Sequence, residues 1–172
     1  MALSAETVAI VSEKTEQAVE ILQEQGVDLW ITLVRETTQV RDPMLDPLLG
    51  MDLTWISALL IHRSGERVAI VGRFDRDNVE RLGAYDRVIA YDQSIKPDLL
   101  KAIRGFDPQQ IALNYSEDDP ASDGLTYGLF RRLSRMLADT PYASRLVSAE
   151  SVIASVRGRK TPTEIKLIKT AV

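Results

Sequence analysis

The sequence predicts an α/β domain built on one mixed sheet of about five or six strands flanked by helices. Segments rich in β-branched and large apolar residues alternate along the chain with segments whose apolar residues repeat at helical spacing. Two of the apolar segments, 55–62 and 67–72, lie on either side of Ser64-Gly65, which predicts an antiparallel hairpin. A chain of 172 residues with 45% hydrophobic and 27% charged residues suits one globular domain.

The first part of the chain predicts a helix that leads directly into strands. Ser12 is a suitable cap for this helix, and Gly26 can take the left-handed conformation that ends it. The apolar face of the helix would consist of Ala18, Ile21 and Leu22. Segment 27–34 is typical of a buried strand, and the hairpin provides the next two strands.

The remainder predicts regular alternation. We expect helices at 76–82, 96–104, 124–138 and 148–156, and strands at 87–91, 110–115 and around 146–147. The helix at 124–138 has the clearest stripe, and Asp123 is its expected cap. The apolar residues of that stripe are Leu125, Leu129, Leu133, Met136 and Leu137.

Residues 35–53 do not fit this alternation. The segment runs for 19 residues, contains Pro43, Pro47 and Gly50, and has no sustained hydrophobic period. Connections of this length are uncommon in compact domains and are often functional or lie at an interface. We therefore expect a loop here with a role beyond joining two strands.

Residues 157–172 predict the start of another helix. Thr161 is a good cap, Pro162 suits the first helical position, and Glu164 can complete a capping box. Ile165, Ile168 and Val172 form one apolar stripe, and a helix of about 11 residues is marginal in water without a packing partner. We therefore expect residues 1–156 to form the domain. Residues 157–172 would be a linker and the first helix of a further domain. The basic residues of this segment fit a solvated hinge, with a binding surface as the alternative.

Composition excludes several classes of function. The net charge of −4 offers no bulk attraction to nucleic acid or to anionic membranes. The first residues lack a basic n-region, and the longest apolar stretch, 56–61, is far short of the ~20 residues that span a bilayer. Cysteine is absent, so disulfides and thiolate chemistry are excluded. We expect a cytoplasmic protein that has no nucleic acid or membrane partner.

The residues do not indicate a catalytic centre. His62 is the single histidine, lies at the end of an apolar strand, and cannot form a metal site alone. The acidic run 117–119 precedes a proline and lacks the spacing of an EF-hand. Neither a Gly-x-Ser-x-Gly elbow nor a phosphate-binding glycine loop is present. We therefore predict no catalytic residue, metal ligand or cofactor in this chain, and no enzymatic activity for the chain by itself.

The carboxyl-terminal segment carries a family resemblance. Its pattern Arg-x-x-Lys-Thr-x-x-Glu-Ile-x-x-Ile-x-x-Ala resembles the junction between the amino-terminal and catalytic "pita-bread" domains of the creatinase/prolidase/Xaa-Pro aminopeptidase family, peptidase family M24. A weaker likeness extends upstream through residues 26–33, Leu49-Gly50 and the hairpin. The matching junction residues are Arg157, Lys160, Thr161, Glu164, Ile165, Ile168 and Ala171.

The resemblance carries several implications. It implies an amino-terminal domain with a ribonuclease-H-like motif that forms a homodimer and limits substrate access. In such proteins the catalytic domain, which we expect to be absent from this chain, binds two divalent metal ions, Mn, Co or Zn. Its ligands are two Asp, one His and two Glu. The parent protein would be a hydrolase, a metallopeptidase acting on short proline-containing peptides. The resemblance does not choose among aminopeptidase, dipeptidase and creatinase.

The candidate site is the loop between 41 and 52. In the resembling family this segment lies towards the active site of a neighbouring subunit. Arg41 is a candidate partner for a substrate carboxylate, and Asp42 or Asp52 for an amino group. The alternative is that these residues cap turns and keep the loop solvated.

A second hypothesis for the whole chain is a non-enzymatic module that binds a protein or peptide. Some creatinase-like proteins, including a histone chaperone subunit, lack the metal site and keep the fold for protein contacts. Direct binding by the isolated domain would distinguish this hypothesis from the first one.

Overall fold

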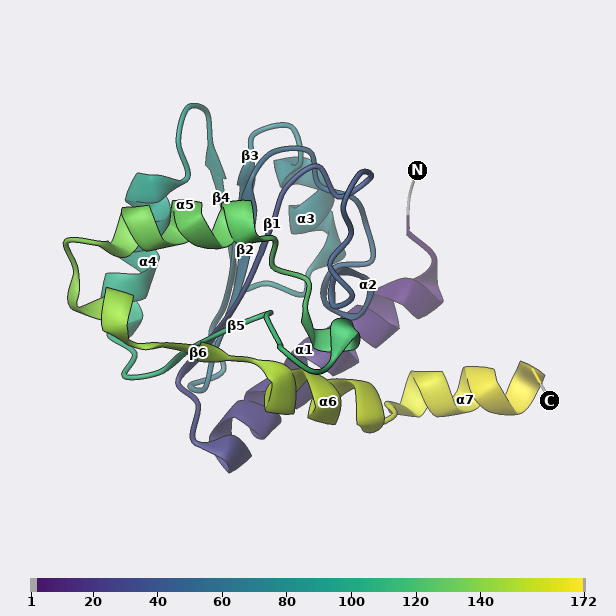
Figure 1. The fold of residues 1–172 in the computed structure, drawn as a ribbon. Coiled ribbons are helices and arrows are strands. Elements are labelled where there is room, and N and C mark those ends of the chain that lie inside the picture. The colour runs from purple at the N-terminus through teal and green to yellow at the C-terminus, as the bar shows by residue number, and fades with distance from the viewer. Residues whose placement is uncertain (1–2, 172) are drawn as a thin grey trace.

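The computed structural model describes residues 3–171. Val172, the last residue of the predicted apolar stripe, lies outside the described residues, as do Met1 and Ala2. Within the described part, one mixed six-stranded sheet has helices on both faces, which confirms the predicted α/β fold class (Figure 1). No helix in this part is long and apolar enough to cross a membrane.

The elements follow the predicted alternation. The strands are β1 (Leu29–Val34), β2 (Ser57–His62), β3 (Arg67–Gly72), β4 (Arg87–Tyr91), β5 (Ile111–Leu113) and β6 (Leu146–Ser148). The α-helices are α1 (Ala5–Gln25), α2 (Leu45–Leu48), α3 (Arg76–Leu82), α4 (Lys96–Phe106), α5 (Tyr127–Leu137), α6 (Glu150–Gly158) and α7 (Pro162–Ala171). Two 3₁₀ turns, η1 (Pro120–Ser122) and η2 (Pro141–Ser144), precede α5 and β6.

The strand order is β4-β3-β2-β1-β5-β6. Strand β2 runs antiparallel to both of its neighbours, β1 and β3, as the hairpin predicted. The other pairs, β3 with β4, β1 with β5 and β5 with β6, are parallel. The chain therefore builds outward from β1 to β4 and then crosses back, so that the strand order reverses between β1 and β5.

Two apolar layers cover the sheet. Helices α1, α2, α3 and α6 cover one face of the sheet, and α4 and α5 cover the other (Figure 1). The side chains of each group of helices form one apolar core with the face that they cover. Alternation along β1 assigns its residues to the two layers, because successive strand residues point to opposite faces. Leu29, Ile31 and Leu33 belong to the α4–α5 layer, whereas Trp30 and Val34 belong to the other.

The first helix is longer than predicted. Helix α1 begins at Ala5, and the hydroxyl of Ser4 accepts a hydrogen bond from the amide of Thr7 at 3.1 Å. The predicted cap at Ser12 is therefore wrong, because Ser12 lies inside the helix. The predicted end is confirmed, since Gly26 has φ 70°.

The predicted start of the 124–138 helix is also wrong. Helix α5 begins at Tyr127, and Thr126 caps it by accepting a hydrogen bond from the amide of Leu129. Residues before it are held differently, because the amide of Leu125 donates to the carbonyl of Asn114 at 2.7 Å. The backbone at residues 124–125 is therefore held beside the residue that follows β5 and does not belong to the helix.

Candidate functional site

Strands β1, β3, β4, β5 and β6 run in the same direction, because β2 is antiparallel to β1 and β3 and the other pairs are parallel. In open α/β sheets, ligands bind outside the carboxyl ends of the strands, where the strand order reverses. Here that crevice lies beyond the ends of β1 and β5, and the loop 35–53 leaves from β1 beside it. The predicted site residues belong to this loop.

The Asp42 side chain lies in the buried part of this loop. Its carboxylate accepts hydrogen bonds from Nδ2 of Asn114 at 3.0 and 3.1 Å and from the amide of Met44 at 2.7 Å. Asn114 follows β5 directly and is itself fixed, because its Oδ1 accepts a 2.6 Å bond from Nε1 of Trp30 and its Nδ2 donates to Thr32. One buried polar network therefore ties the loop to β1 and to the end of β5.

The surroundings of Asp42 are buried, and its carboxylate is already engaged by neighbouring donors. Its residue surface is 2% exposed, and this burial raises the pKa of the carboxyl group, while the hydrogen bonds from Met44 and Asn114 oppose the rise. The bond to Met44 is the turn-capping contact that the alternative interpretation expected. A substrate amino group would have to displace this network to reach Asp42.

Arg41 and Asp52 lie together on the surface of the same loop. The Arg41 guanidinium pairs with the carboxylates of Asp46 and Asp52. The hydrogen bond to Asp46, followed by the one to Asp52, raises the pKa of Arg41 despite partial burial. Asp52 also accepts a 3.0 Å bond from the hydroxyl of Thr37. Both predicted residues are half-exposed and close to each other, so their role towards a substrate stays a prediction.

The sequence did not predict helix α2 within this loop. Its four residues, Leu45–Leu48, bury Leu45 and Leu48 against α1. A single turn is too short for a hydrophobic period to reveal it. Gly50 follows α2 at a point where the loop lies close to α1, and its φ is 69°. A Cβ atom at this position would lie 2.6 Å from a methyl group of Thr7.

An open cleft of 460 Å³ adjoins the loop at the same end of the sheet. Its walls include Arg35, Trp55, Tyr91 and Arg132, which we call the aromatic–arginine cleft. Arg35 directly follows β1, Trp55 lies just before β2, and Tyr91 is the last residue of β4. Arg132 belongs to α5. Sequence reasoning missed this group. The available signal was that an aromatic residue stands at the end of β4 and another just before β2.

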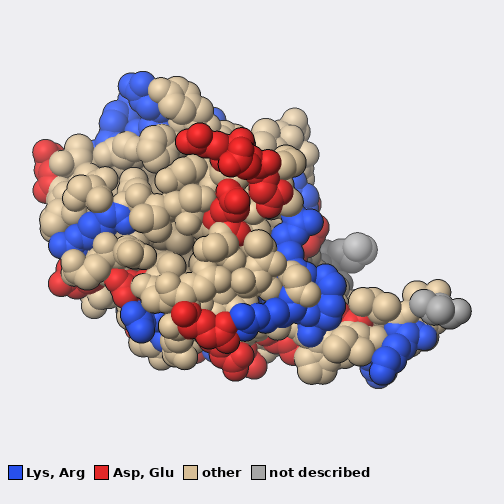
Figure 2. All heavy atoms as spheres, turned by 60° about the horizontal axis from the view of Figure 1, so that its bottom comes forward, with Lys and Arg blue, Asp and Glu red and all other residues tan. Residues whose placement is uncertain are grey.

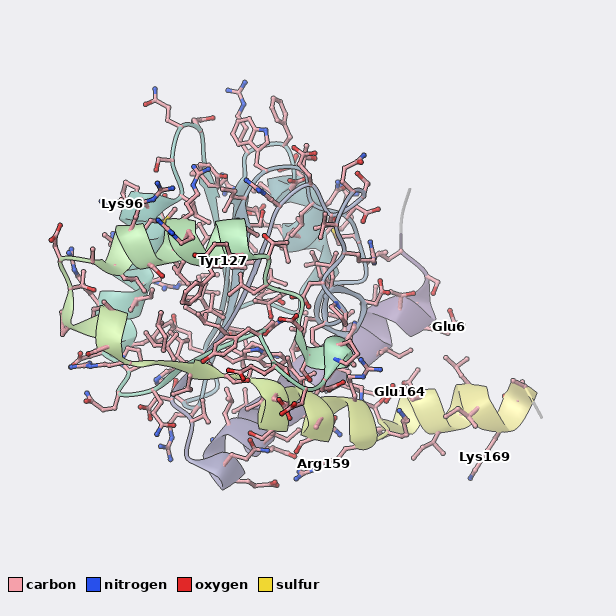
Figure 3. All side chains as sticks on the ribbon, in the orientation of Figure 1. Glu6, Lys96, Tyr127, Arg159, Glu164 and Lys169 are labelled. Carbon is pink, nitrogen blue, oxygen red and sulfur yellow. The ribbon has the colours of Figure 1, made fainter. Side chains whose placement is uncertain are left out.

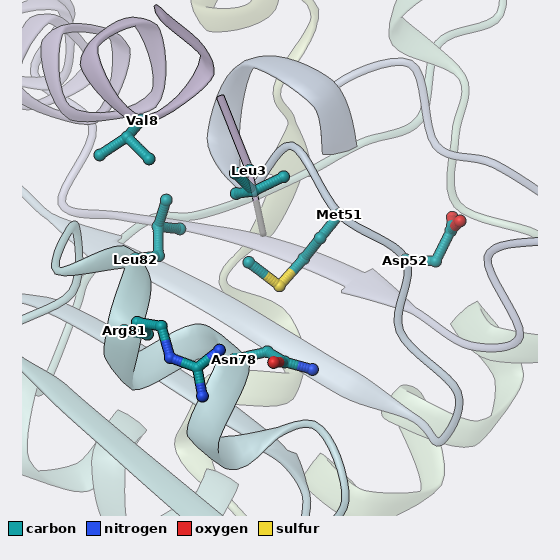
Figure 4. A pocket seen from close by; sticks show the side chains of 7 residues that line it. All are labelled: Leu3, Val8, Met51, Asp52, Asn78, Arg81 and Leu82. Carbon is teal, nitrogen blue, oxygen red and sulfur yellow. The ribbon is translucent and has the colours of Figure 1, made fainter. Parts of the chain in front are cut away.

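A smaller hollow of 310 Å³ lies between α1, α3 and the loop (Figure 4). Leu3, Val8, Met51 and Leu82 provide most of its lining, and Arg81 and Asn78 stand at its rim. The Asp52 side chain points away from this group in Figure 4. The hollow is therefore mainly apolar, without a cluster of ionisable groups among its described lining residues.

The junction between α6 and α7 is built around a buried lysine. Lys14 of α1 is 1% exposed, and its Nζ donates to the carbonyls of Val156 and Arg159, both at 2.6 Å. The same ammonium pairs with Glu164 at 2.9 Å. Lys14 thus satisfies the carboxyl end of α6 and holds the first turn of α7 at once.

The predicted capping box at the start of α7 is confirmed. The amide of Thr161 donates to Glu164 at 2.7 Å, and the amide of Glu164 donates to the hydroxyl of Thr161 at 3.3 Å. Glu13 of α1 accepts from the amide and hydroxyl of Thr163. Hydrogen bonds from Thr161 and Thr163 lower the pKa of Glu13. The start of α7 is therefore fixed to α1.

Beyond its first turn, α7 projects from the body of the molecule (Figure 1). Its large apolar side chains Ile165, Leu167 and Ile168 are 42%, 40% and 52% exposed. Figure 2 shows basic side chains on the projecting helix, and Figure 3 shows Lys169 pointing outward. The helix is thus held at one end and lacks a covering partner among the described residues.

The described residues do not provide a metal centre. Within residues 3–171, no three His, Cys, Asp or Glu side chains are grouped so that they could hold a metal ion. The His62 ring stacks on Phe106 with centroids 4.6 Å apart, and its Nδ1 lies 2.8 Å from the hydroxyl of Ser64. Burial lowers the pKa of His62. The acidic residue Asp28 instead receives the amides of Gln109 and Gln110 at the start of β5.

Comparison with solved structures identifies the fold of this chain. An X-Pro aminopeptidase from Thermotoga maritima matches with a TM-score of 0.67 and 18% identity over 90% of this chain and 38% of that one. The creatinase/prolidase N-terminal domain of an X-Pro dipeptidase from Streptococcus pyogenes matches with a TM-score of 0.55 and 16% identity. That match covers 85% of this chain and 98% of that domain. The fold is that of the creatinase/prolidase amino-terminal domain.

The creatinase/prolidase amino-terminal fold also occurs outside peptidases. The N-terminal domain of FACT complex subunit SPT16 from Cicer arietinum has a TM-score of 0.64 and 10% identity, over 95% of this chain and 41% of that chain. The present chain spans less than half the length of the T. maritima enzyme that it matches. No protein-family model and no curated protein sequence matches it.

Proposed function

We propose that this chain is the non-catalytic amino-terminal domain of a metal-dependent Xaa-Pro peptidase of the aminopeptidase or dipeptidase type, acting in the cytoplasm. The observation that carries the proposal is α7, whose start is fixed by Lys14 and Glu13 while its apolar side chains stay exposed. Exposed apolar residues at helical spacing are typical of a helix that packs against another element. The fold covers 38% of the T. maritima aminopeptidase, which supports a further domain as that partner.

In this proposal the chain orients the catalytic domain. The capping box and the buried Lys14 set the direction in which the polypeptide leaves the domain at residue 161. The chain would also contribute to a homodimer and limit the size of substrates that enter. The Arg41–Asp52 surface is the part of the loop that is available for contact with a substrate or a second subunit.

Metal chemistry belongs to the further domain in this proposal. The residues described here do not offer the two Asp, one His and two Glu that would hold two divalent ions. A pair of Mn, Co or Zn ions bound elsewhere would supply the activated water for hydrolysis. The described residues would therefore position substrate and domains without touching the reacting atoms.

The proposal is tested by measuring peptidase activity of the protein that the full gene encodes. The gene should be read past the codon for Val172, and the encoded protein should be purified and assayed with short Xaa-Pro peptides and Mn²⁺. We expect hydrolysis that a chelator abolishes and Mn²⁺ restores, and no hydrolysis by residues 1–172. A stop codon after Val172, or a continuation without the five ligands, would overturn the proposal.

The alternative is a non-enzymatic module that binds a protein or peptide. It is favoured by the comparable TM-score to the SPT16 N-terminal domain and by the aromatic–arginine cleft. Isothermal titration of residues 1–172 with candidate protein partners distinguishes the two. Tight binding to a protein, together with a longer form that has no peptidase activity, would support the module and exclude the peptidase.

A further inference from the structure

Strand β4 has an open edge. It is the last strand on its side of the sheet, and no strand within residues 3–171 pairs with its outer edge. Residues 88–91 are half-buried, whereas nearly every residue of β1, β2, β3 and β5 is buried. An open edge is a template for pairing with another chain, and proteins protect such edges with short strands, lysine or proline. The other edge strand, β6, has only three residues, but β4 has five and contains neither lysine nor proline.

The free backbone groups of this edge belong to Val88 and Ala90. The carbonyl of Tyr91 accepts a 3.2 Å hydrogen bond from the amide of Arg73, so the backbone of Tyr91 faces β3. Along a strand, the N–H and C=O of one residue point to one side and those of the next residue to the other. The backbone groups of Val88 and Ala90 therefore point outward, and no other described residue bonds to them.

A hollow of 490 Å³ lies beside this edge, between β4 and α4. Ile89 and Phe106 form its apolar lining. Two small residues of α4, Ala102 and Gly105, face the same hollow, and nothing lies within 4 Å of a Cβ atom placed at Gly105. The hollow therefore has room for an apolar side chain that arrives next to Ile89.

The charges around the hollow are balanced. Its lining contains two acidic residues, Glu66 and Asp98, and two basic residues, Arg87 and Lys101. Arg87 pairs with Glu66 at 3.0 Å. The whole chain has a net charge of −4, so this neutral surface is one where two identical copies can meet without net repulsion. A strongly charged partner would gain no attraction from it.

We propose that the β4 edges of two copies of this chain pair antiparallel around a two-fold axis at Ile89 and join the two sheets into one. In this register Val88 lies opposite Ala90 of the second copy, and each such pair exchanges two backbone hydrogen bonds. Every free backbone group of both edges then has a partner. On the α4 side, the two Ile89 side chains meet in the hollow, and Arg87 lies opposite Tyr91 of the second copy, where a cation–π contact can form.

This inference rests on the homodimer of the proposed function and names the surface that forms it. The two can fail separately, because pairing of β4 is measured on residues 1–172, whereas peptidase activity is measured on the longer form. A dimer that forms through another surface would overturn this inference and leave the homodimer standing.

Cysteine cross-linking tests the register, and the natural chain contains no cysteine that could interfere. The two copies of residue 89 form a non-hydrogen-bonded pair with Cα atoms about 4.5 Å apart, which a disulfide can bridge. We expect Ile89→Cys to give a covalent dimer on mild oxidation. Val88→Cys is the matched control, because its two copies are diagonal neighbours about 7–8 Å apart and should not cross-link. Cross-linking of Val88→Cys without Ile89→Cys would overturn the proposal.

Sedimentation equilibrium of residues 1–172 tests the pairing itself. We expect a monomer–dimer equilibrium with a Kd of about 1–100 μM. Ala90→Pro removes an outward-facing N–H and no bond to β3, so it should weaken the dimer at least about tenfold while the circular dichroism spectrum stays that of the wild type. Ala90→Ser keeps the N–H and should dimerise like the wild type. A monomer at every concentration up to about 1 mM, or a dimer that Ala90→Pro does not weaken, would overturn the proposal.

Discussion

At the scale of single residues, Asp42 is the least expected group in the molecule. A buried carboxylate normally has a cationic partner, because burial alone disfavours its charge. Here its hydrogen-bond partners are the neutral amide of Asn114 and the backbone of Met44. The loop is therefore anchored by a group whose contribution to stability depends on its protonation.

Asp42→Asn tests this dependence. Burial raises the folded-state pKa of Asp42, so its contribution to stability is present below the unfolded-state pKa and is lost as pH rises through the folded-state pKa. The asparagine variant does not titrate. We expect the free energy of unfolding of Asp42→Asn, relative to wild type, to increase from about pH 4 to about pH 7 in urea titrations. A constant or decreasing difference would contradict the raised pKa.

Asp42→Ala serves as the control for the hydrogen bonds. It removes the acceptor for both Asn114 and the Met44 amide, and we expect a loss of about 1–3 kcal/mol because buried donors stay unpaired. The loss should exceed that of Asp42→Asn at neutral pH, since asparagine keeps one acceptor oxygen.

Gly124→Ala tests the close approach of the backbone to this network. A Cβ atom at position 124 would lie 2.1 Å from Oδ2 of Asp42, so one of the two must move. We expect a loss of about 1–3 kcal/mol in urea unfolding. Adding Asp42→Ala removes the obstructing oxygen, so the double variant should lose less than the sum of the two single losses. Additive losses would show that the contact is not the cause. Gly105→Ala is a suitable control, since nothing lies within 4 Å of a Cβ atom there.

At the scale of elements, the α6–α7 junction depends on one side chain from α1. Lys14→Met keeps most of the aliphatic length but removes the ammonium that binds Val156, Arg159 and Glu164. We expect a loss of about 3 kcal/mol, because carbonyls and a carboxylate stay unpaired, and faster amide exchange in the first turn of α7. Hydrogen exchange and urea unfolding measure both effects. Lys169→Met, on exposed α7, should change neither; equal effects in both variants would exclude the proposed clamp.

Sequence patterns predicted the limits of an element correctly where contacts between nearby residues determine those limits. Helix α3 and strands β3 and β4 have the predicted limits, and the capping box at Thr161 and Glu164 is present. The predicted starts of α1 and α5 were wrong because more than one residue near each could cap a helix. Contacts made elsewhere then selected Ser4 and Thr126 over Ser12 and Asp123.

At the scale of the whole molecule, the exposed apolar side of α7 is the surface that the proposed further domain would cover. Ile168→Gln should leave the free energy of unfolding of residues 1–172 within about 0.5 kcal/mol of wild type, because Ile168 is 52% exposed. In the proposed longer protein we expect a loss of about 2 kcal/mol or more from the same change. Thermal or urea unfolding of both lengths checks this, with Lys169→Gln as the neighbouring control. A small loss in both lengths would contradict burial of α7 against another domain.

The sequence by itself determined the alternation of elements, the hairpin and the capped start of α7. Each depends on residues within a few positions of one another, where spacing alone decides which side chains meet. The tertiary structure decided the surroundings of Asp42 and Lys14 and brought together the residues that line the aromatic–arginine cleft. Asp42 and Asn114 are 72 residues apart, and Lys14 and Val156 are 142 apart. Such contacts arise only when strand order brings distant segments together, so local spacing does not contain them.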